Sequence, residues 1–171
     1  MVKSDELQLL SALLGAPTEE SLPLLREVAT EHGWLQPAVN ELEDTALDHW
    51  QAHHTALFIN GYPTTPCLPF ASPWRSGCMH GPLLEELNEL LARIGVTSEQ
   101  LPPDYLGVLL ECAALLQAKA STDAAEMQRE LWDEQLQPWL PRFAAALQQH
   151  SPLQLYRALG VRLQALCDEQ H

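Results

Sequence analysis

Basic side chains are scarce in this chain. Nine Lys and Arg residues stand against 23 Asp and Glu residues, which gives a formal net charge of −14. Because phosphate binding needs clustered Lys and Arg, this balance argues against nucleic acid as a partner. Opposite potentials steer association, so the same balance suits a partner with a basic segment, although acidity also serves solubility by itself.

Long apolar runs are also lacking. None approaches the roughly 18 residues that a membrane-spanning helix needs, and no charged-then-apolar leader follows Met1. We therefore expect no membrane insertion. The four cysteines, Cys67, Cys78, Cys112 and Cys167, are scattered, unlike the dense disulfide frameworks of small secreted domains. The two observations predict a cytoplasmic protein with reduced thiols.

Strand patterns are absent as well. β-Branched residues are few and leucine dominates, which predicts an all-α fold. A length of 171 residues with 46% hydrophobic residues allows one substantial core, so we predict a single domain over residues 1–171. Apolar residues recurring at helical spacing predict a helical bundle of about seven helices, interrupted by one long proline-rich loop.

The proline-rich loop is predicted between Gly61 and Pro82. This stretch holds five prolines and three glycines, a density that an ordinary helix does not tolerate. Its aromatic and apolar residues favour packing against the rest of the protein rather than disorder. Before the loop, the apolar pattern predicts one long helix from Pro37 to Asn60.

The sharpest feature lies between Pro102 and Leu116. Two prolines precede an apolar run in which only Asp104 and Glu111 are charged. Proline and an acidic residue both suit the first turn of a helix, so we predict a mostly buried helix here. Because Asp104 and Glu111 lie seven positions apart, close to two turns, we expect both carboxylates on one stripe. Beside an aromatic cleft, such a stripe suits a ligand with adjacent cations followed by an apolar segment.

Catalytic and metal-binding motifs are weak. The nucleophile elbow, the Walker loop and the dinucleotide-binding glycine pattern are absent, so we predict no enzyme, no catalytic residue and no cofactor. His49 and His53 have the i, i+4 spacing that can chelate a metal, and Cys67 and Cys78 lie in the proline-rich loop. No paired CxxC and no glutamate of the HExxH zinc motif support a metal site. The alternatives are a small helical metal-binding protein or enzyme built on these residues, and a plain acidic helical adaptor.

Three segments in fixed order carry a family resemblance. They are Leu57-Phe58 followed by Pro69-Phe70-Ala71-Ser72-Pro73-Trp74-Arg75-Ser76-Gly77, then P-P-D-Y-L-G-V-L-L-E-C-A-A-L-L from Pro102, and then Leu136-Gln137-Pro138-Trp139 with Phe143. In sequence and spacing they resemble the Leu-Phe helix end, the Pro-Tyr-x-Ser loop, the Pro-Asp-His/Tyr-Leu helix and the Pro-Trp…Phe stretch of the TorD/DmsD/NarJ family of redox-enzyme maturation chaperones. The resemblance covers roughly residues 5 to 168.

The resemblance implies an all-α chaperone that binds the twin-arginine leader, or another N-terminal segment, of a molybdoenzyme catalytic subunit. Such chaperones hold the apo-form of that subunit during cofactor insertion, before export. The positions that match the leader-binding residues of the family are Asp104, Tyr105, Glu111, Leu57, Phe58, Phe70, Ser72 and Trp74. Carboxylates accept guanidinium groups bidentately, and an aromatic groove buries the apolar part of a leader.

Two details of the sequence bear on the kind of leader and on the oligomeric state that we expect. Tyr105 stands where many family members have histidine, which points to the NarJ-like side, where the leader of the client can be vestigial. The prolines and the small polar connector at Ala118 to Thr122 permit a domain-swapped dimer as well as a monomer.

Overall fold

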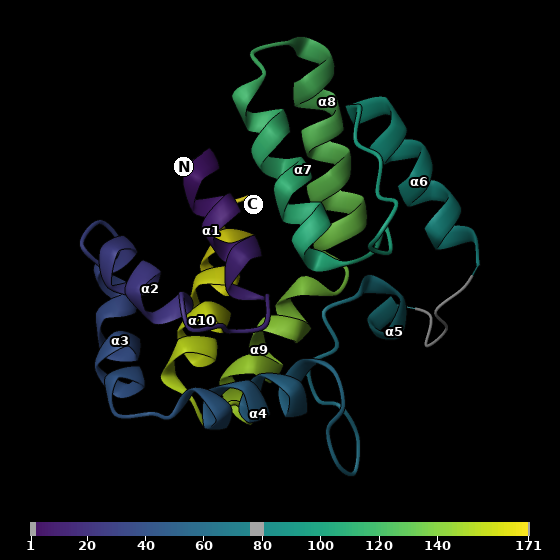
Figure 1. Ribbon diagram of the computed structural model, residues 1–171. Helices are drawn as coiled ribbons and strands as arrows, with labels where there is room; N and C mark the ends of the chain where they lie inside the picture. Colours follow the sequence, from purple (N-terminus) through teal and green to yellow (C-terminus); the bar gives the residue numbers. More distant parts are fainter. Residues whose placement is uncertain (1–2, 76–80, 171) are drawn as a thin grey trace. The chain divides into compact units, whose positions relative to one another are not determined.

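The regular structure of this protein is helical. A computed structural model describes residues 3–75 and 81–170, and within these ranges it contains helices and one isolated β-bridge but no strand (Figure 1). The first helices are α1 (Ser4–Leu13), α2 (Ser21–Ala29), the 3₁₀ turn η1 (Gly33–Leu35), α3 (Gln36–Glu43), α4 (Leu47–Phe58) and α5 (Ala71–Arg75). They are followed by α6 (Pro82–Ile94), α7 (Leu106–Ala118), α8 (Thr122–Glu130), the π-helix η2 (Leu131–Leu136), α9 (Leu140–His150) and α10 (Gln154–Glu169). The predicted all-α class is confirmed, although these ranges hold more helices than the seven expected.

The helix predicted from Pro37 to Asn60 is two helices, and the prediction of one was wrong. The N–H of Thr45 donates to the carbonyl of Leu42, and its hydroxyl donates to the carbonyl of Glu41 at 2.8 Å, so α3 ends in a tight turn. Ala46 is then extended before α4 begins. The threonine hydroxyl competes with the helical hydrogen-bond ladder, which apolar periodicity does not register.

The proline-rich segment contains a short helix that the sequence did not predict. In α5, Pro73 is the third residue, a position where the missing N–H has no intrahelical partner. Residues 61–69 form the irregular part of the loop, with an isolated bridge residue at its far end. Residues 76–80, which include Cys78, lie outside the described residues.

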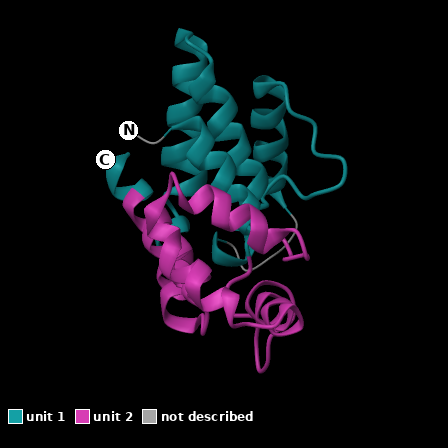
Figure 2. Cartoon of the chain, turned by 60° about the vertical axis from the view of Figure 1, so that its left-hand side comes forward, with its two compact units in different colours: residues 1–14, 69–141, 166–171 teal, residues 15–68, 142–165 magenta. Residues whose placement is uncertain are grey.

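The contacts of the chain fall into two compact units, coloured separately in Figure 2. Unit 1 comprises residues 1–14, 69–141 and 166–171, and unit 2 comprises residues 15–68 and 142–165. The prediction of one domain over residues 1–171 stays a prediction.

Unit 1 is built around α7. Most of this helix is buried, because apolar side chains cover nearly its whole circumference. It packs against α1 on one side, and α6 and α8 run beside it (Figure 1). The hydroxyls of Ser4 and Ser11 on α1 donate to the carbonyls of Ala114 and Gly107 on α7, at 3.1 and 2.9 Å. These bonds fix the register of α1 along α7.

Unit 2 has an aromatic core. The rings of His54, Phe58, Phe143 and Tyr156 contact one another, with centroid distances between 5.1 and 6.5 Å. The indole N–H of Trp50 donates to the Tyr156 hydroxyl at 3.0 Å, so the polar groups of both buried side chains are hydrogen-bonded.

Candidate functional site

Asp104 is a buried hydrogen-bond acceptor in unit 1. It is 1% exposed, and its Oδ2 atom accepts from the backbone N–H of Ser72 at 2.9 Å and from the Ser72 hydroxyl at 2.6 Å. Ser72 is the second residue of α5, where a helix leaves its N–H groups without an internal partner. The carboxylate satisfies one of these groups, so Asp104 fixes the start of α5 to the segment that precedes α7.

An aromatic pair accompanies this contact. Two backbone hydrogen bonds of 3.0 and 2.8 Å join residues 69–71 to residues 104–106 and form the antiparallel bridge between Phe70 and Tyr105. The two ring centroids lie 5.5 Å apart at an interplanar angle of 46°. This geometry lies within the favourable range for aromatic pairs. Both side chains are only partly buried, so the pair presents apolar surface to solvent.

The Tyr105 ring rests on the first turn of α7 because residue 107 is glycine. A Cβ atom at Gly107 would lie 2.4 Å from the Cε1 atom of the ring. Burial raises the pKa of the Tyr105 phenol, and the negative charge of Glu111 raises it further. The Tyr105 side chain therefore lies within electrostatic reach of the Glu111 carboxylate.

Glu111 is exposed on α7 and borders a hollow of about 350 Å³. Its Oε1 atom accepts from the Ser11 hydroxyl at 3.4 Å. The hollow is lined by Val96, Thr97, Ser98, Glu99, Gln100, Leu101, Val108 and Glu111. It thus combines two carboxylates with apolar surface, and Leu101 is 50% exposed. Such a site can receive a guanidinium group together with its aliphatic stem.

The expected stripe of two carboxylates is wrong. The N–H of Tyr105 donates to the carbonyl of Pro102, Tyr105 is extended, and α7 begins only at Leu106. Asp104 therefore lies outside the helical periodicity and is buried against α5, whereas Glu111 is exposed beside residues 96–101. The turn made by the prolines moves the helix start past Asp104.

The remaining predicted residues divide between the units. Trp74 lies on α5, half buried, and its neighbour Arg75 donates to the Gln135 side chain on η2 at 3.0 Å. Leu57 and Phe58 belong to unit 2, where they are 3% and 2% exposed. The structure therefore brings Phe70, Ser72, Asp104 and Tyr105 together in unit 1, which also contains Trp74 and Glu111, and it places Leu57 and Phe58 in the core of unit 2.

Among the described residues, those of the metal or enzyme alternative do not form a metal-binding cluster. Within residues 3–75 and 81–170, no group of three or more His, Cys, Asp or Glu side chains is placed to hold a metal. His49 is exposed, and His53 lines a cavity of unit 2. Cys67 is fully buried, and burial raises the pKa of its thiol to about 12, which disfavours the reactive thiolate.

Sequence reasoning missed Glu99 and the segment around it. The signal available was Gly95, which ends α6 in the left-handed conformation at φ 92°. That signal predicts where the helix stops, but only the tertiary fold brings residues 96–101 alongside Val108 and Glu111. The described part of the chain contains no helix with the length and apolarity that a bilayer crossing requires.

Comparison with known proteins identifies the family of this chain. Residues 11–145 match the family described as nitrate reductase delta subunit. The chain belongs to this family. The match confirms the resemblance to the TorD/DmsD/NarJ chaperones seen in the sequence, because relatives of that kind also align with this member.

Two relatives of this family member are named chaperone proteins. YcdY of Escherichia coli is 28% identical over 109 residues, which cover 64% of this chain and 56% of YcdY. TorD of Vibrio parahaemolyticus is 31% identical over 159 residues, which cover 80% of this chain and 74% of TorD. The chain thus spans little more than half the length of YcdY.

A solved structure shares the fold of this family member. It is a protein from Archaeoglobus fulgidus described as a redox enzyme maturation protein. The superposition has a TM-score of 0.70 and covers 98% of this chain and 95% of the other, at 22% identity. This likeness establishes the helical fold.

Proposed function

We propose that this chain is a cytoplasmic, non-enzymatic chaperone for a molybdenum-containing oxidoreductase. It binds the twin-arginine leader, or a related N-terminal segment, of the apo-form of the catalytic subunit and holds it during cofactor insertion before export. Family membership supports the role in redox-enzyme maturation. The observation that carries the peptide site is the Phe70–Tyr105 pair, fixed by Ser72 and Asp104, within electrostatic reach of Glu111.

The arginines of the leader are received by exposed carboxylates. Glu111 and Glu99 border one hollow, and Leu101 and Val108 supply apolar surface for the arginine stems. Because exposed ion pairs contribute only about 0–1 kcal/mol each, these pairs provide selectivity more than affinity. Burial of the apolar part of the leader, at about 25 cal/mol per Å², supplies most of the binding free energy.

Asp104 has an indirect role in this proposal. The residue is 1% exposed and its carboxylate accepts two hydrogen bonds from Ser72, so it helps to hold the aromatic pair in place without contacting an arginine. This replaces the expectation that Asp104 and Glu111 bind arginines side by side. Phe70, Tyr105 and Trp74 then form the apolar part of the site.

Calorimetric titration with a synthetic twin-arginine leader peptide tests the proposal. We expect Glu111→Gln to weaken binding about fivefold, which corresponds to the loss of one exposed ion pair. Glu86→Gln is the matched control, because Glu86 is an exposed glutamate on α6 that does not line the hollow. Glu86→Gln should bind as the unaltered protein does.

A second peptide separates arginine recognition from general attraction to an acidic protein. Replacing both arginines by lysines keeps the charge but removes bidentate pairing, so we expect weaker binding. Equal affinity of both peptides for the unaltered protein and for Glu111→Gln would refute the site proposed on α7.

A further inference from the structure

Two long segments of this acidic chain lack carboxylates altogether. Neither residues 49–84 nor residues 135–167 contain Asp or Glu, although the chain has 23 such residues in 171. The ionisable nitrogen-bearing side chains in these segments are His49, His53, His54, Arg75, His80, Arg142, His150, Arg157 and Arg162. Much of both segments lies in unit 2, where they form the walls of one cavity.

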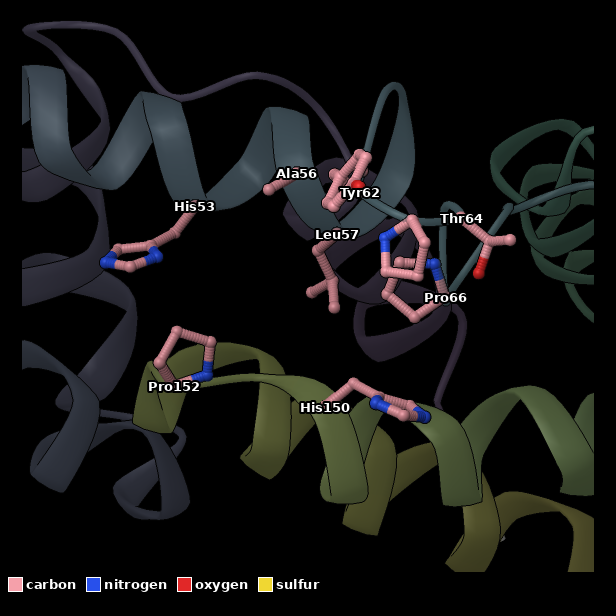
Figure 3. Close-up of a pocket in the computed structure, with 10 residues that line it drawn as sticks. His53, Ala56, Leu57, Tyr62, Thr64, Pro66, His150 and Pro152 are labelled. Atoms are coloured by element: carbon pink, nitrogen blue, oxygen red, sulfur yellow. The ribbon is translucent and has the colours of Figure 1, made fainter.

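This cavity, here called the His53–His150 cavity, has a volume of about 450 Å³. Figure 3 shows His53 and Leu57 projecting from α4 on one wall, with His150 and Pro152 on the opposite wall. The lining residues are His53, Ala56, Leu57, Gly61, Tyr62, Pro63, Thr64, Pro66, His150 and Pro152. No carboxylate is among them, and the volume lies in the range of ligand sites, which is about 300–1,000 Å³.

The wall formed by residues 61–66 is fixed to α4. The N–H of Gly61 donates to the Thr65 hydroxyl at 3.0 Å, and the N–H of Cys67 donates to the carbonyl of Leu57 at 3.0 Å. A Cβ at Gly61 would lie 2.4 Å from the Ala56 carbonyl oxygen, so only glycine allows this tight return of the chain. The position of this wall of the cavity is therefore fixed by hydrogen bonds and by close backbone packing.

The lining of the cavity includes one large and strongly exposed side chain. Tyr62 is 98% exposed. Exposed tyrosines are enriched in binding interfaces because their rings are large, rigid and amphipathic. On the opposite wall, Arg157 donates to the carbonyls of Ser151 at 3.1 Å and Pro152 at 3.0 Å, and these bonds hold the turn that carries Pro152.

We propose that the His53–His150 cavity binds an acidic peptide segment, one that carries Asp or Glu beside proline or other apolar residues. The imidazole N–H groups of His53 and His150 donate to the carboxylate, and Tyr62 and the lining prolines contact the apolar residues. Charge complementarity supports this occupant: the chain has a net charge of −14, which disfavours acidic partners in general, but no carboxylate lines this cavity. The partner thus has the opposite charge from the basic leader proposed for unit 1.

The test uses the full chain and two fluorescein-labelled octapeptides. One is composed of proline, leucine and glutamate, and the other has glutamine in place of each glutamate. In fluorescence anisotropy titrations we expect the glutamate peptide to bind about tenfold more tightly than the glutamine peptide, as for a charge-assisted hydrogen bond. The double variant His53→Gln/His150→Gln should lose this preference.

His49→Gln is the matched control, because His49 lies one turn before His53 on α4, is exposed and does not line the cavity. This variant should keep the preference for the glutamate peptide. Circular dichroism of each variant establishes that it is folded, and shifts of the His53 and His150 imidazole NMR signals report binding independently. Equal binding of the two peptides, an unchanged preference in the double variant, or full displacement of the peptide by equimolar inorganic phosphate would overturn the proposal.

Discussion

The Ser72 hydroxyl donates a 2.6 Å hydrogen bond to the Asp104 carboxylate across 32 positions of sequence. Because Asp104 is buried, this bond replaces hydration that the carboxylate has lost. It connects α5 to the segment before α7, next to the backbone bridge between Phe70 and Tyr105. The aromatic surface proposed to bind a leader is therefore held by this side-chain contact together with the backbone bridge.

We predict strong energetic coupling between Ser72 and Asp104. Ser72→Ala removes the hydroxyl bond to the buried carboxylate and keeps the backbone one, whereas Asp104→Ala removes both, so a double-mutant cycle of the two should give an interaction of about 1.5–3 kcal/mol. Urea unfolding of the four proteins measures it. Ser121→Ala, which removes the cap of α8 beyond the other end of α7, should show additivity with Asp104→Ala. Additivity in the Ser72 cycle would contradict the prediction.

We predict that Gly160→Ala destabilises unit 2. A Cβ at Gly160 would lie 2.6 Å from the carbonyl oxygen of Ala144, because α9 and α10 approach closely there. We expect a loss of about 1–3 kcal/mol in urea unfolding, as for overpacking, even though alanine favours helix. Gly33→Ala is the matched control, since open space surrounds that position, and it should stay within about 0.5 kcal/mol. Equal stabilities of the two variants would disprove close packing at Gly160.

We predict that Tyr156→Phe lowers the free energy of unfolding by more than the removal of an exposed hydroxyl would. The Tyr156 hydroxyl accepts from the buried indole N–H of Trp50, which the variant leaves without an acceptor. The cost of an unsatisfied buried donor is about 1–3 kcal/mol, measurable by thermal or urea unfolding. Tyr62→Phe removes the same atom from a side chain that is 98% exposed and should leave stability unchanged. A neutral Tyr156→Phe would indicate that Trp50 finds another acceptor.

We predict that stability falls in alkaline solution because of buried thiols. Burial raises the pKa of Cys67 to about 12, and raises the pKa values of Cys112 and Cys167 to about 11, from 9.0. The unfolded chain therefore loses these protons at lower pH than the folded chain. The contribution of the protonated thiols to the free energy of unfolding is fully present below about pH 9 and is lost as the pH rises through the pKa values of the folded protein.

Urea unfolding under reducing conditions at rising pH measures this effect. Each thiol lowers the free energy of unfolding by at most about 1.4 kcal/mol for each unit of pH. Cys67→Val keeps a buried apolar side chain but cannot ionise, so it should reduce the slope. A slope that Cys67→Val leaves unaltered, or rapid reaction of all three thiols in the folded protein near neutral pH, would show that these thiols are not buried.

Local patterns predicted much of the fold. The spacing of leucines gave the helices near α1, α6 and α10, and the apolar run from Tyr105 gave the buried helix α7. The pattern failed at Thr45, where a side-chain hydrogen bond ends α3, and at α5, where a proline sits in the first turn. Apolar periodicity registers neither the hydrogen bond of the Thr45 side chain nor the tolerance of a helix for proline in its first turn.

The candidate site was only partly predictable. Matching of family segments pointed to Phe70, Ser72, Asp104 and Tyr105, which the structure does bring together. Spacing along a helix misplaced the Asp104 side chain, because Tyr105 is extended and α7 starts after it. Glu99 was not predicted at all, since its approach to Glu111 depends on the path of the chain after Gly95.

The sequence by itself determined the helical class, the family and the acidic character of this protein, because these follow from composition, apolar periodicity and short ordered motifs. Only the tertiary structure decided which carboxylate is buried and which is exposed. It also decided that two segments without carboxylates line one cavity in unit 2. The physical reason is that burial and charge complementarity depend on residues far apart in sequence, whose distances are set by packing.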